Sequence, residues 1–133
     1  MTDNLKECYY CGRTDQIELH HCIHGKIGRK LATQYHLLVG LCGNCHRGTN
    51  GVHGKYGYEK DLKLKAEAQT AWEKRRVRKG KSFLTAHQEW LELFGIDYVK
   101  EFSDFVNECE RDFITEEQEE EIFRQLYPEG DHT

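Results

Sequence analysis

The stretch that decides the fold reads CYYCGRTDQIELHHC over residues 8–22 and LCGNCHRGTNGVH over residues 41–53. It contains two Cys-x-x-Cys pairs, Cys8/Cys11 and Cys42/Cys45, separated by the 30 residues 12–41. Each pair can form a tight turn whose two sulfurs converge on one ion, and four thiolates complete the tetrahedral shell of a structural zinc site. We therefore expect one structural Zn²⁺ at these cysteines. Four buried or redox-active thiols are the alternative.

The remaining cysteines and the N-terminal residues indicate a reducing compartment. Residues 1–6, MTDNLK, lack the apolar core of a secretion signal, and no apolar run is long enough to span a bilayer. Without export, six cysteines are better explained as thiols than as disulfides. Cys22 and Cys109 lie outside the two pairs and are expected to be packed as small apolar side chains.

Histidines are interleaved with the cysteine pairs. His20 and His21 are adjacent, so on a strand they would point to opposite faces, and one could bind a metal while the other faces a substrate. His46 and Asn50 are four residues apart, and His53 follows three later. On a helix these three would share a face, but the glycines among them favour a turn for Asn50 or His53. Additional zinc ligands or surface residues are the alternative interpretation.

The region around these motifs predicts short strands and loops. Residues 17–21 alternate in polarity and predict a short strand, and the apolar run 36–41 is a plausible partner strand. Residues 25–34 between them are predicted to form a basic loop. Because the apolar core of residues 8–54 would be small, metal binding is expected to stabilise it.

From residue 58 onward the pattern is helical. Residues 58–77 are rich in helix formers, with Gly80 expected to end that helix and Ser82 to cap the next. Apolar residues at helical spacing predict a helix over 83–94 that stops at Gly95. A third predicted helix has one apolar face made of Val99, Phe102, Val106, Cys109 and Phe113.

A fourth helix is predicted to run through Leu126, because Thr115 and Gln118 have the spacing of a capping box. The sequence therefore predicts an α+β fold. Its parts are a zinc-stapled core over residues 1–57 and a helical extension over residues 58–133.

The net charge of −4 hides a strong asymmetry. Residues 1–81 contain 16 Lys/Arg and 8 Asp/Glu, whereas residues 82–133 contain 3 Lys/Arg and 15 Asp/Glu. The first part therefore carries +8 and the second −12. A basic part joined to an acidic part suggests a polyanionic partner for the first, although two solvated faces would have the same composition.

The residues Glu18-Leu19-His20-His21 and Leu41-Cys42-Gly43-Asn44-Cys45-His46 together resemble the motif of the HNH, or His-Me finger, endonucleases. In that family a strand hairpin and a short helix hold one divalent ion, and many members pin this finger with two Cys-x-x-Cys pairs. The segment 31–55 also resembles small HNH proteins of phages and prophages and, more loosely, the RecA-dependent nucleases of phage recombination. The resemblance does not extend to the acidic C-terminal part.

The resemblance implies specific roles. His21 matches the general base, and His20 and His46 match ligands of the catalytic ion, with a further ligand at Asn50 or His53. The ion would be Mg²⁺, Mn²⁺, Ni²⁺ or Zn²⁺. The implied protein is a metal-dependent DNA endonuclease with a ββα-metal core, acting in phage DNA processing or recombination and leaving 5′-phosphate and 3′-hydroxyl ends.

One position departs from the family pattern. The family usually has an Asn that orients the general base, and this sequence has His36 at about that place. His36, or alternatively Gln34, would have to make the orienting hydrogen bond to His21.

Basic residues around the motif are candidates for phosphate contacts, which supply affinity without sequence specificity. The candidates are Lys26, Arg29, Lys30, Arg47 and Lys55, and the basic run 74–81 would extend the track. The acidic segment could dock a recombinase or another phage protein. We expect a DNA-binding protein of the bacterial host cytoplasm without membrane contact.

The sequence is also compatible with two competing functions. A zinc-ribbon DNA-binding or protein-adaptor module would use the cysteines without catalysis and would have no use for an imidazole at position 21. A recombination accessory protein would cleave DNA only together with a partner recombinase.

Overall fold

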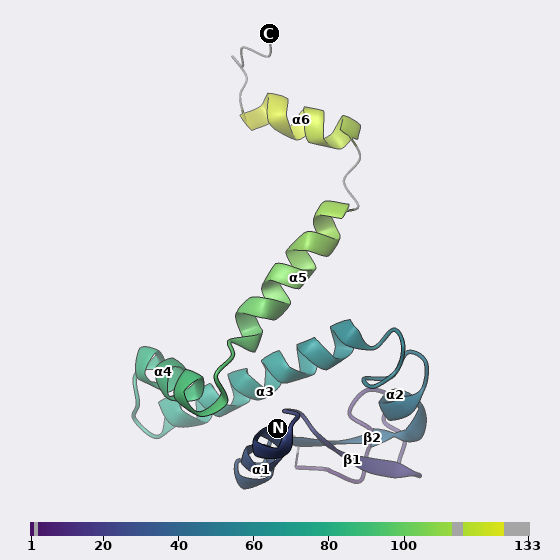
Figure 1. Cartoon of the computed structure of the whole chain (residues 1–133), viewed down its shortest axis with the longest axis vertical. Coiled ribbons are helices and arrows are strands. Elements are labelled where there is room, and N and C mark those ends of the chain that lie inside the picture. Colours follow the sequence, from purple (N-terminus) through teal and green to yellow (C-terminus); the bar gives the residue numbers. More distant parts are fainter. Residues whose placement is uncertain (2, 113–115, 127–133) are drawn as a thin grey trace. The chain divides into compact units, whose positions relative to one another are not determined.

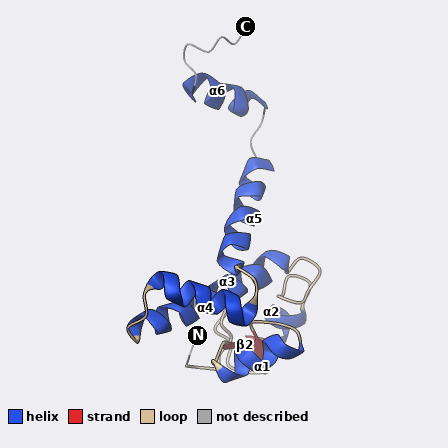
Figure 2. Ribbon diagram, turned by 60° about the vertical axis from the view of Figure 1, so that its left-hand side comes forward, coloured by secondary structure: helices blue, strands red, loops and turns tan. Residues whose placement is uncertain are grey.

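The computed structural model describes residue 1, residues 3–112 and residues 116–126, and these form an α+β fold (Figure 1). The elements in chain order are β1 (Ile17–His21), α1 (Lys26–Gln34), β2 (Leu38–Cys42), α2 (Gly43–Arg47), α3 (Tyr58–Arg78), α4 (Phe83–Phe94), α5 (Tyr98–Asp112) and α6 (Glu116–Leu126). Most of the described residues are helical, and β1 and β2 make one small sheet (Figure 2). The chain divides into two compact units, Met1–Phe102 and Ser103–Thr133.

The sheet is an antiparallel pair in which His20 lies opposite Val39 and His21 opposite Leu38. The strand predicted at residues 17–21 is confirmed, and β2 begins two residues later than the apolar run 36–41 suggested. All five residues of β2 are buried. At Gly40 an added Cβ would lie 2.5 Å from the carbonyl oxygen of Leu5, so glycine is needed where the N-terminal segment crosses the strand.

The prediction of a basic loop over residues 25–34 was wrong, because Lys26–Gln34 form helix α1. Gly28 normally lowers helix propensity. Here a Cβ at residue 28 would lie only 3.0 Å from Cγ2 of Ile23, so the glycine allows the helix to pack closely against a buried side chain. Burial of Ala32 on the same helix adds a tertiary contact that composition did not reveal.

Helices α3 and α4 form close to their predicted bounds and pack around two buried tryptophans. Trp72 of α3 and Trp90 of α4 have ring centroids 5.7 Å apart. Tyr35, at the end of α1, contacts Trp72 edge to face at 5.8 Å. This aromatic contact ties α1 to α3, and both helices belong to the unit Met1–Phe102.

Local signals set the helix ends in this region. The Ser82 side chain accepts a hydrogen bond from the backbone N–H of Thr85 at 3.1 Å, which is the predicted N-cap. Gly95 ends α4 in the left-handed conformation with φ of 79°, as its position suggested. Helices α5 and α6 are present, whereas Phe113 and the proposed capping residue Thr115 lie outside the described residues. Among the described helices, none combines the length and apolar character required to cross a membrane.

Candidate functional site

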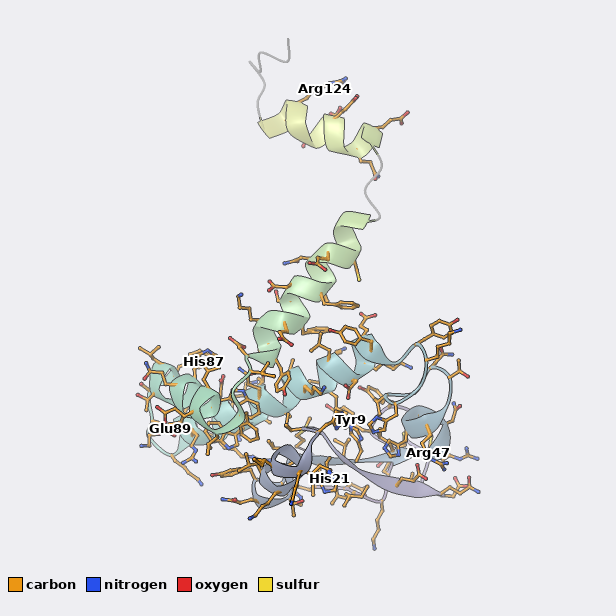
Figure 3. All side chains as sticks on the ribbon, in the orientation of Figure 1. Tyr9, His21, Arg47, His87, Glu89 and Arg124 are labelled. Atoms are coloured by element: carbon orange, nitrogen blue, oxygen red, sulfur yellow. The ribbon has the colours of Figure 1, made fainter. Side chains whose placement is uncertain are left out.

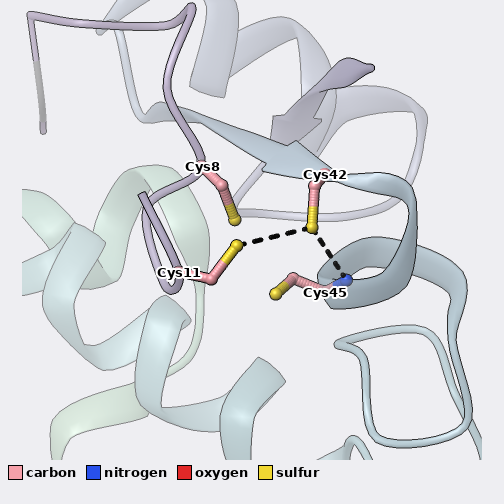
Figure 4. Close-up of side chains that lie close together, drawn as sticks. All are labelled: Cys8, Cys11, Cys42 and Cys45. Atoms are coloured by element: carbon pink, nitrogen blue, oxygen red, sulfur yellow. Dashed lines mark hydrogen bonds between the residues drawn. The ribbon is translucent and has the colours of Figure 1, made fainter. Parts of the chain in front are cut away.

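The four paired cysteines converge on one point (Figure 4). One sulfur from each of Cys8, Cys11, Cys42 and Cys45 lies within 4.8 Å of the other three. The Sγ atoms of Cys11 and Cys42 are 3.7 Å apart. This spacing fits four thiolates around a tetrahedral ion such as zinc.

Backbone groups favour the thiolate form of one cysteine in this cluster, Cys8. Although burial raises the pKa of the Cys8 thiol, backbone N–H groups of Cys42, Cys11 and Tyr10 lower it to about 6. Burial and the neighbouring sulfurs raise the pKa of Cys45 to about 12. A bound cation would stabilise all four thiolates together, because it offsets the repulsion between them.

The first cysteine turn also contacts α3. The Tyr9 hydroxyl donates to Oε2 of Glu67 at 2.5 Å, and the Tyr10 hydroxyl donates to the carbonyl oxygen of Lys60 at 3.2 Å. The Tyr9 side chain that makes the first of these contacts is labelled in Figure 3. The cysteine cluster therefore constrains α3 as well as the sheet.

A second cluster consists of imidazole rings around His20. The His20 ring centroid is 5.1 Å from those of His46 and His53, and the latter two are 4.8 Å apart. Ligand nitrogens of these three rings lie within 4.8 Å of one another. His20 is 2% exposed, and its buried Nε2 has no hydrogen-bond partner. An unpaired buried nitrogen is costly, so a metal ligand role suits this atom.

The glycine-rich turn after α2 returns His53 to His46. The backbone N–H of His53 donates to the carbonyl oxygen of His46 at 2.9 Å. At Gly54 an added Cβ would overlap the carbonyl oxygen of Gly48, so only glycine permits this tight return. The geometry therefore brings together His20, His46 and His53. Asn50 is exposed outside this group, and its carbonyl oxygen accepts from Lys60 Nζ at 2.8 Å.

A carboxylate orients His46 from outside the cluster. Glu18 Oε1 accepts from His46 Nδ1 at 2.8 Å, and Glu18 Oε2 pairs with Nη2 of Arg47 at 2.7 Å. The hydrogen bonds from Arg47 and, to a smaller extent, from His46 lower the pKa of Glu18 to about 2. With its Nδ1 protonated, His46 keeps the lone pair of Nε2 for a ligand.

The surroundings of His20 and His53 favour the neutral form of both rings, which is the form that binds metals. Burial, helped by the neighbouring rings of His24, His46 and His53, lowers the pKa of His20 to about 3. Burial, and to a smaller extent repulsion from the rings of His46 and His24, lowers the pKa of His53. A neutral imidazole offers a lone pair without having to lose a proton first.

Two residues that sequence reasoning missed lie against this cluster. His24 Nε2 is 2.8 Å from Oδ1 of Asp61, and ligand atoms of His20, His24 and Asp61 lie within 4.8 Å of one another. His24 follows His20 by four residues, which is a weak signal. Asp61 is 37 residues from His24, so nothing local links the two.

His21 is oriented by a residue that the sequence did not indicate. Its Nε2 lies 3.2 Å from Oγ1 of Thr33, and Oγ1 donates to the carbonyl oxygen of Arg29 at 3.0 Å. The expectation that His36 or Gln34 orients His21 therefore needs correction. Both line a different cavity together with Trp72, Arg75 and Arg76. His36 lies between α1 and β2 and has a left-handed backbone with φ of 58°.

The histidines surround a cavity of about 360 Å³ that is open to solvent. Its lining residues are Leu19, His20, His21, His24, Gly25, Arg29, His46 and His53. His20 and His21 both border it although neighbouring strand residues diverge, because β1 ends at His21. The cavity thus combines imidazole nitrogens that could bind a metal with one imidazole that contacts a hydroxyl.

The five basic residues expected to contact phosphate are all exposed. Arg29 lines the cavity, and Lys26 and Lys30 belong to the same helix. Arg47, which is labelled in Figure 3, forms an ion pair with Glu18, so its charge is already paired. Lys55 lies over the ring of Tyr56, 5.3 Å from its centroid.

No protein-family model matches this chain, and no curated protein or solved structure is significantly similar to it. What the chain does must therefore be inferred from the geometry of its own side chains.

Proposed function

We propose that this chain is a metal-dependent DNA endonuclease that hydrolyses phosphodiester bonds, with β1, β2 and α2 acting as a ββα-metal core of the HNH type. The observation that carries the proposal is the buried, unpartnered Nε2 of His20 beside His46 and His53. Three imidazoles are a suitable donor set for a divalent transition-metal ion. Such an ion, when bound, would stabilise negative charge on the scissile phosphate and on the leaving oxygen.

His21 is the proposed general base. The Thr33 hydroxyl has a single proton, which it donates to the carbonyl oxygen of Arg29. Thr33 Oγ1 therefore accepts from His21 Nε2, and the proton on Nε2 leaves the lone pair on Nδ1. A neutral imidazole with its orientation set in this way is suited to take a proton from water near neutral pH.

The basic side of α1 is proposed to hold the DNA backbone. Arg29 lines the cavity, and Lys26 and Lys30 are exposed on the same helix. Contacts of this kind give affinity that depends on salt and not on sequence. Phage DNA processing or recombination is the biological setting that the resemblance to phage HNH proteins suggests, with the acidic helices as a docking site for a recombinase.

The test is nicking of a supercoiled plasmid with Mg²⁺, Mn²⁺, Ni²⁺ or Zn²⁺ added singly. His21→Ala should reduce the nicking rate by about 10²- to 10⁴-fold, which is the usual contribution of a general base. His36→Asn is the matched control, because it removes an exposed histidine outside the cavity and Asn tolerates a positive φ.

Equal nicking by wild type and His21→Ala would remove His21 as the base. DNA binding without nicking by either protein would favour a zinc-ribbon binding or adaptor module. Nicking that appears only when a recombinase is added would indicate an accessory nuclease.

A further inference from the structure

We propose that His24, oriented by Asp61, is a further ligand of the ion held by His20, His46 and His53. This inference rests on the proposed metal centre and extends it to a residue of α3. It changes the composition of the site, since the nuclease motif alone contains neither residue.

The first support is position. The His24 ring centroid is 5.3 Å from that of His20 and 5.2 Å from that of His53. His24 lines the same cavity as the other three rings. Ligand atoms of His20, His24 and Asp61 form a second group within 4.8 Å, which shares His20 with the first group. The two groups therefore meet at His20, whose buried Nε2 has no hydrogen-bond partner.

The second support is the protonation pattern. A carboxylate can only accept, so the 2.8 Å contact with Asp61 Oδ1 requires the proton on His24 Nε2. Nδ1 of His24 then keeps its lone pair and can bind a cation. Asp61 is held in place, because its other oxygen accepts from Lys65 Nζ at 3.0 Å and its side chain is 17% exposed.

Two histidines next to His20 are each hydrogen-bonded to a carboxylate. Glu18 fixes the protonated nitrogen of His46, and Asp61 fixes that of His24. Carboxylate–histidine pairs of this kind orient ligand rings and raise their basicity. At the exposed periphery such pairs are common without a metal, but here both histidine rings lie beside His20, whose buried Nε2 has no hydrogen-bond partner.

Two consequences follow from a fourth imidazole. Nitrogen donors favour Zn²⁺, Ni²⁺ and Co²⁺ over Mg²⁺, which prefers oxygen, so the site should select transition metals. Helix α3 also becomes part of the metal centre. Because Tyr9 and Tyr10 tie α3 to the cysteine turn, the structural zinc would position Asp61 as well as His46.

The experiment separates metal binding from catalysis. Full-length protein with zinc at its cysteines is titrated with Co²⁺, and the absorbance of cobalt–imidazole coordination is followed. Sulfur-to-cobalt charge-transfer bands would reveal exchange at the cysteines. His24→Ala and Asp61→Asn should each raise the Kd for Co²⁺ by about 10- to 100-fold, whereas the control His36→Asn should not.

A direct readout complements the titration. Zn²⁺ added to ¹⁵N-labelled wild type should shift the signal of Nδ1 of His24 together with the ligand nitrogens of the other three rings. An unchanged Kd in both variants, or an unshifted His24 ring, would overturn the inference while leaving the nuclease proposal intact. Failure of the wild type to bind Co²⁺ outside the cysteines would overturn both. Zinc content and circular dichroism of each variant check that it folds.

Discussion

Replacement of Glu18 by Gln should weaken binding of the catalytic ion, because one carboxylate serves several donors. Oε1 accepts from His46 Nδ1 at 2.8 Å and from Arg47 Nε at 2.9 Å, and Oε2 accepts from Arg47 Nη2 at 2.7 Å. Gln offers one oxygen and one NH₂ group, so in either orientation its NH₂ faces a donor. The negative charge that raises the basicity of His46 is lost in both orientations. Loss of such an outer partner weakens metal binding by about 10- to 100-fold.

The assay is the cobalt titration of protein whose cysteines already hold zinc. Arg47→Met is the matched control, because it removes the second donor but leaves Glu18 to accept from His46. Its Kd should stay close to that of the wild type. Wild-type affinity in Glu18→Gln, or an equal loss in Arg47→Met, would refute the role assigned to the Glu18–His46 pair.

Three further predictions concern the scaffold. Removal of zinc by a chelator should unfold the segment around the cysteines. Structural zinc contributes about 10–16 kcal/mol to folding, whereas whole domains are stable by only about 5–15 kcal/mol. A protein that keeps its thermal unfolding midpoint without zinc would contradict this prediction. Gly54→Ala should lower the free energy of unfolding by about 1–3 kcal/mol in urea titrations, because the added methyl group overlaps the carbonyl oxygen of Gly48. Gly80→Ala is the control: its methyl group meets no atom within 4 Å, so only the cost of a positive φ remains. Acidification should destabilise the protein in the absence of an added divalent ion, because the folded pKa of His20 is about 3 against 6.5 in the unfolded chain. The stability that is present above about pH 6.5 should fall by at most about 1.4 kcal/mol per pH unit toward pH 3, and the loss between about pH 7 and about pH 5 should be smaller in His20→Gln.

The predictions that agreed with the structure depended on short-range signals. Alternation over residues 17–21 predicted β1, and Ser82 and Gly95 marked the ends of α4, because pleating and capping depend on neighbouring residues. Helix α1 was missed for a related reason. Gly28 weakens a helix locally, and only the close approach of Ile23 makes that glycine favourable.

Some residues of the candidate site could be predicted from the sequence, and others could not. His20 and His46 could be named as ligands from the motif, and the structure brings them together. The contacts that Thr33 and Asp61 make with His21 and His24 could not be anticipated. They depend on where α1 and α3 lie relative to the end of β1 and the loop after it, and side-chain contacts across elements leave no periodic pattern in the sequence.

By itself, the sequence determined the chemistry that is available. The cysteine spacing specified two pairs of sulfurs, since a Cys-x-x-Cys turn can direct both of its sulfurs to one ion, and the fold brings the two pairs together. Tertiary structure alone decided which partners complete the histidine cluster. His53 joins it and Asn50 does not, because the tight turn through Gly54 returns the chain onto His46. Spacing along the chain limits only what neighbours can do, whereas the turns and helix packing select which distant side chains meet.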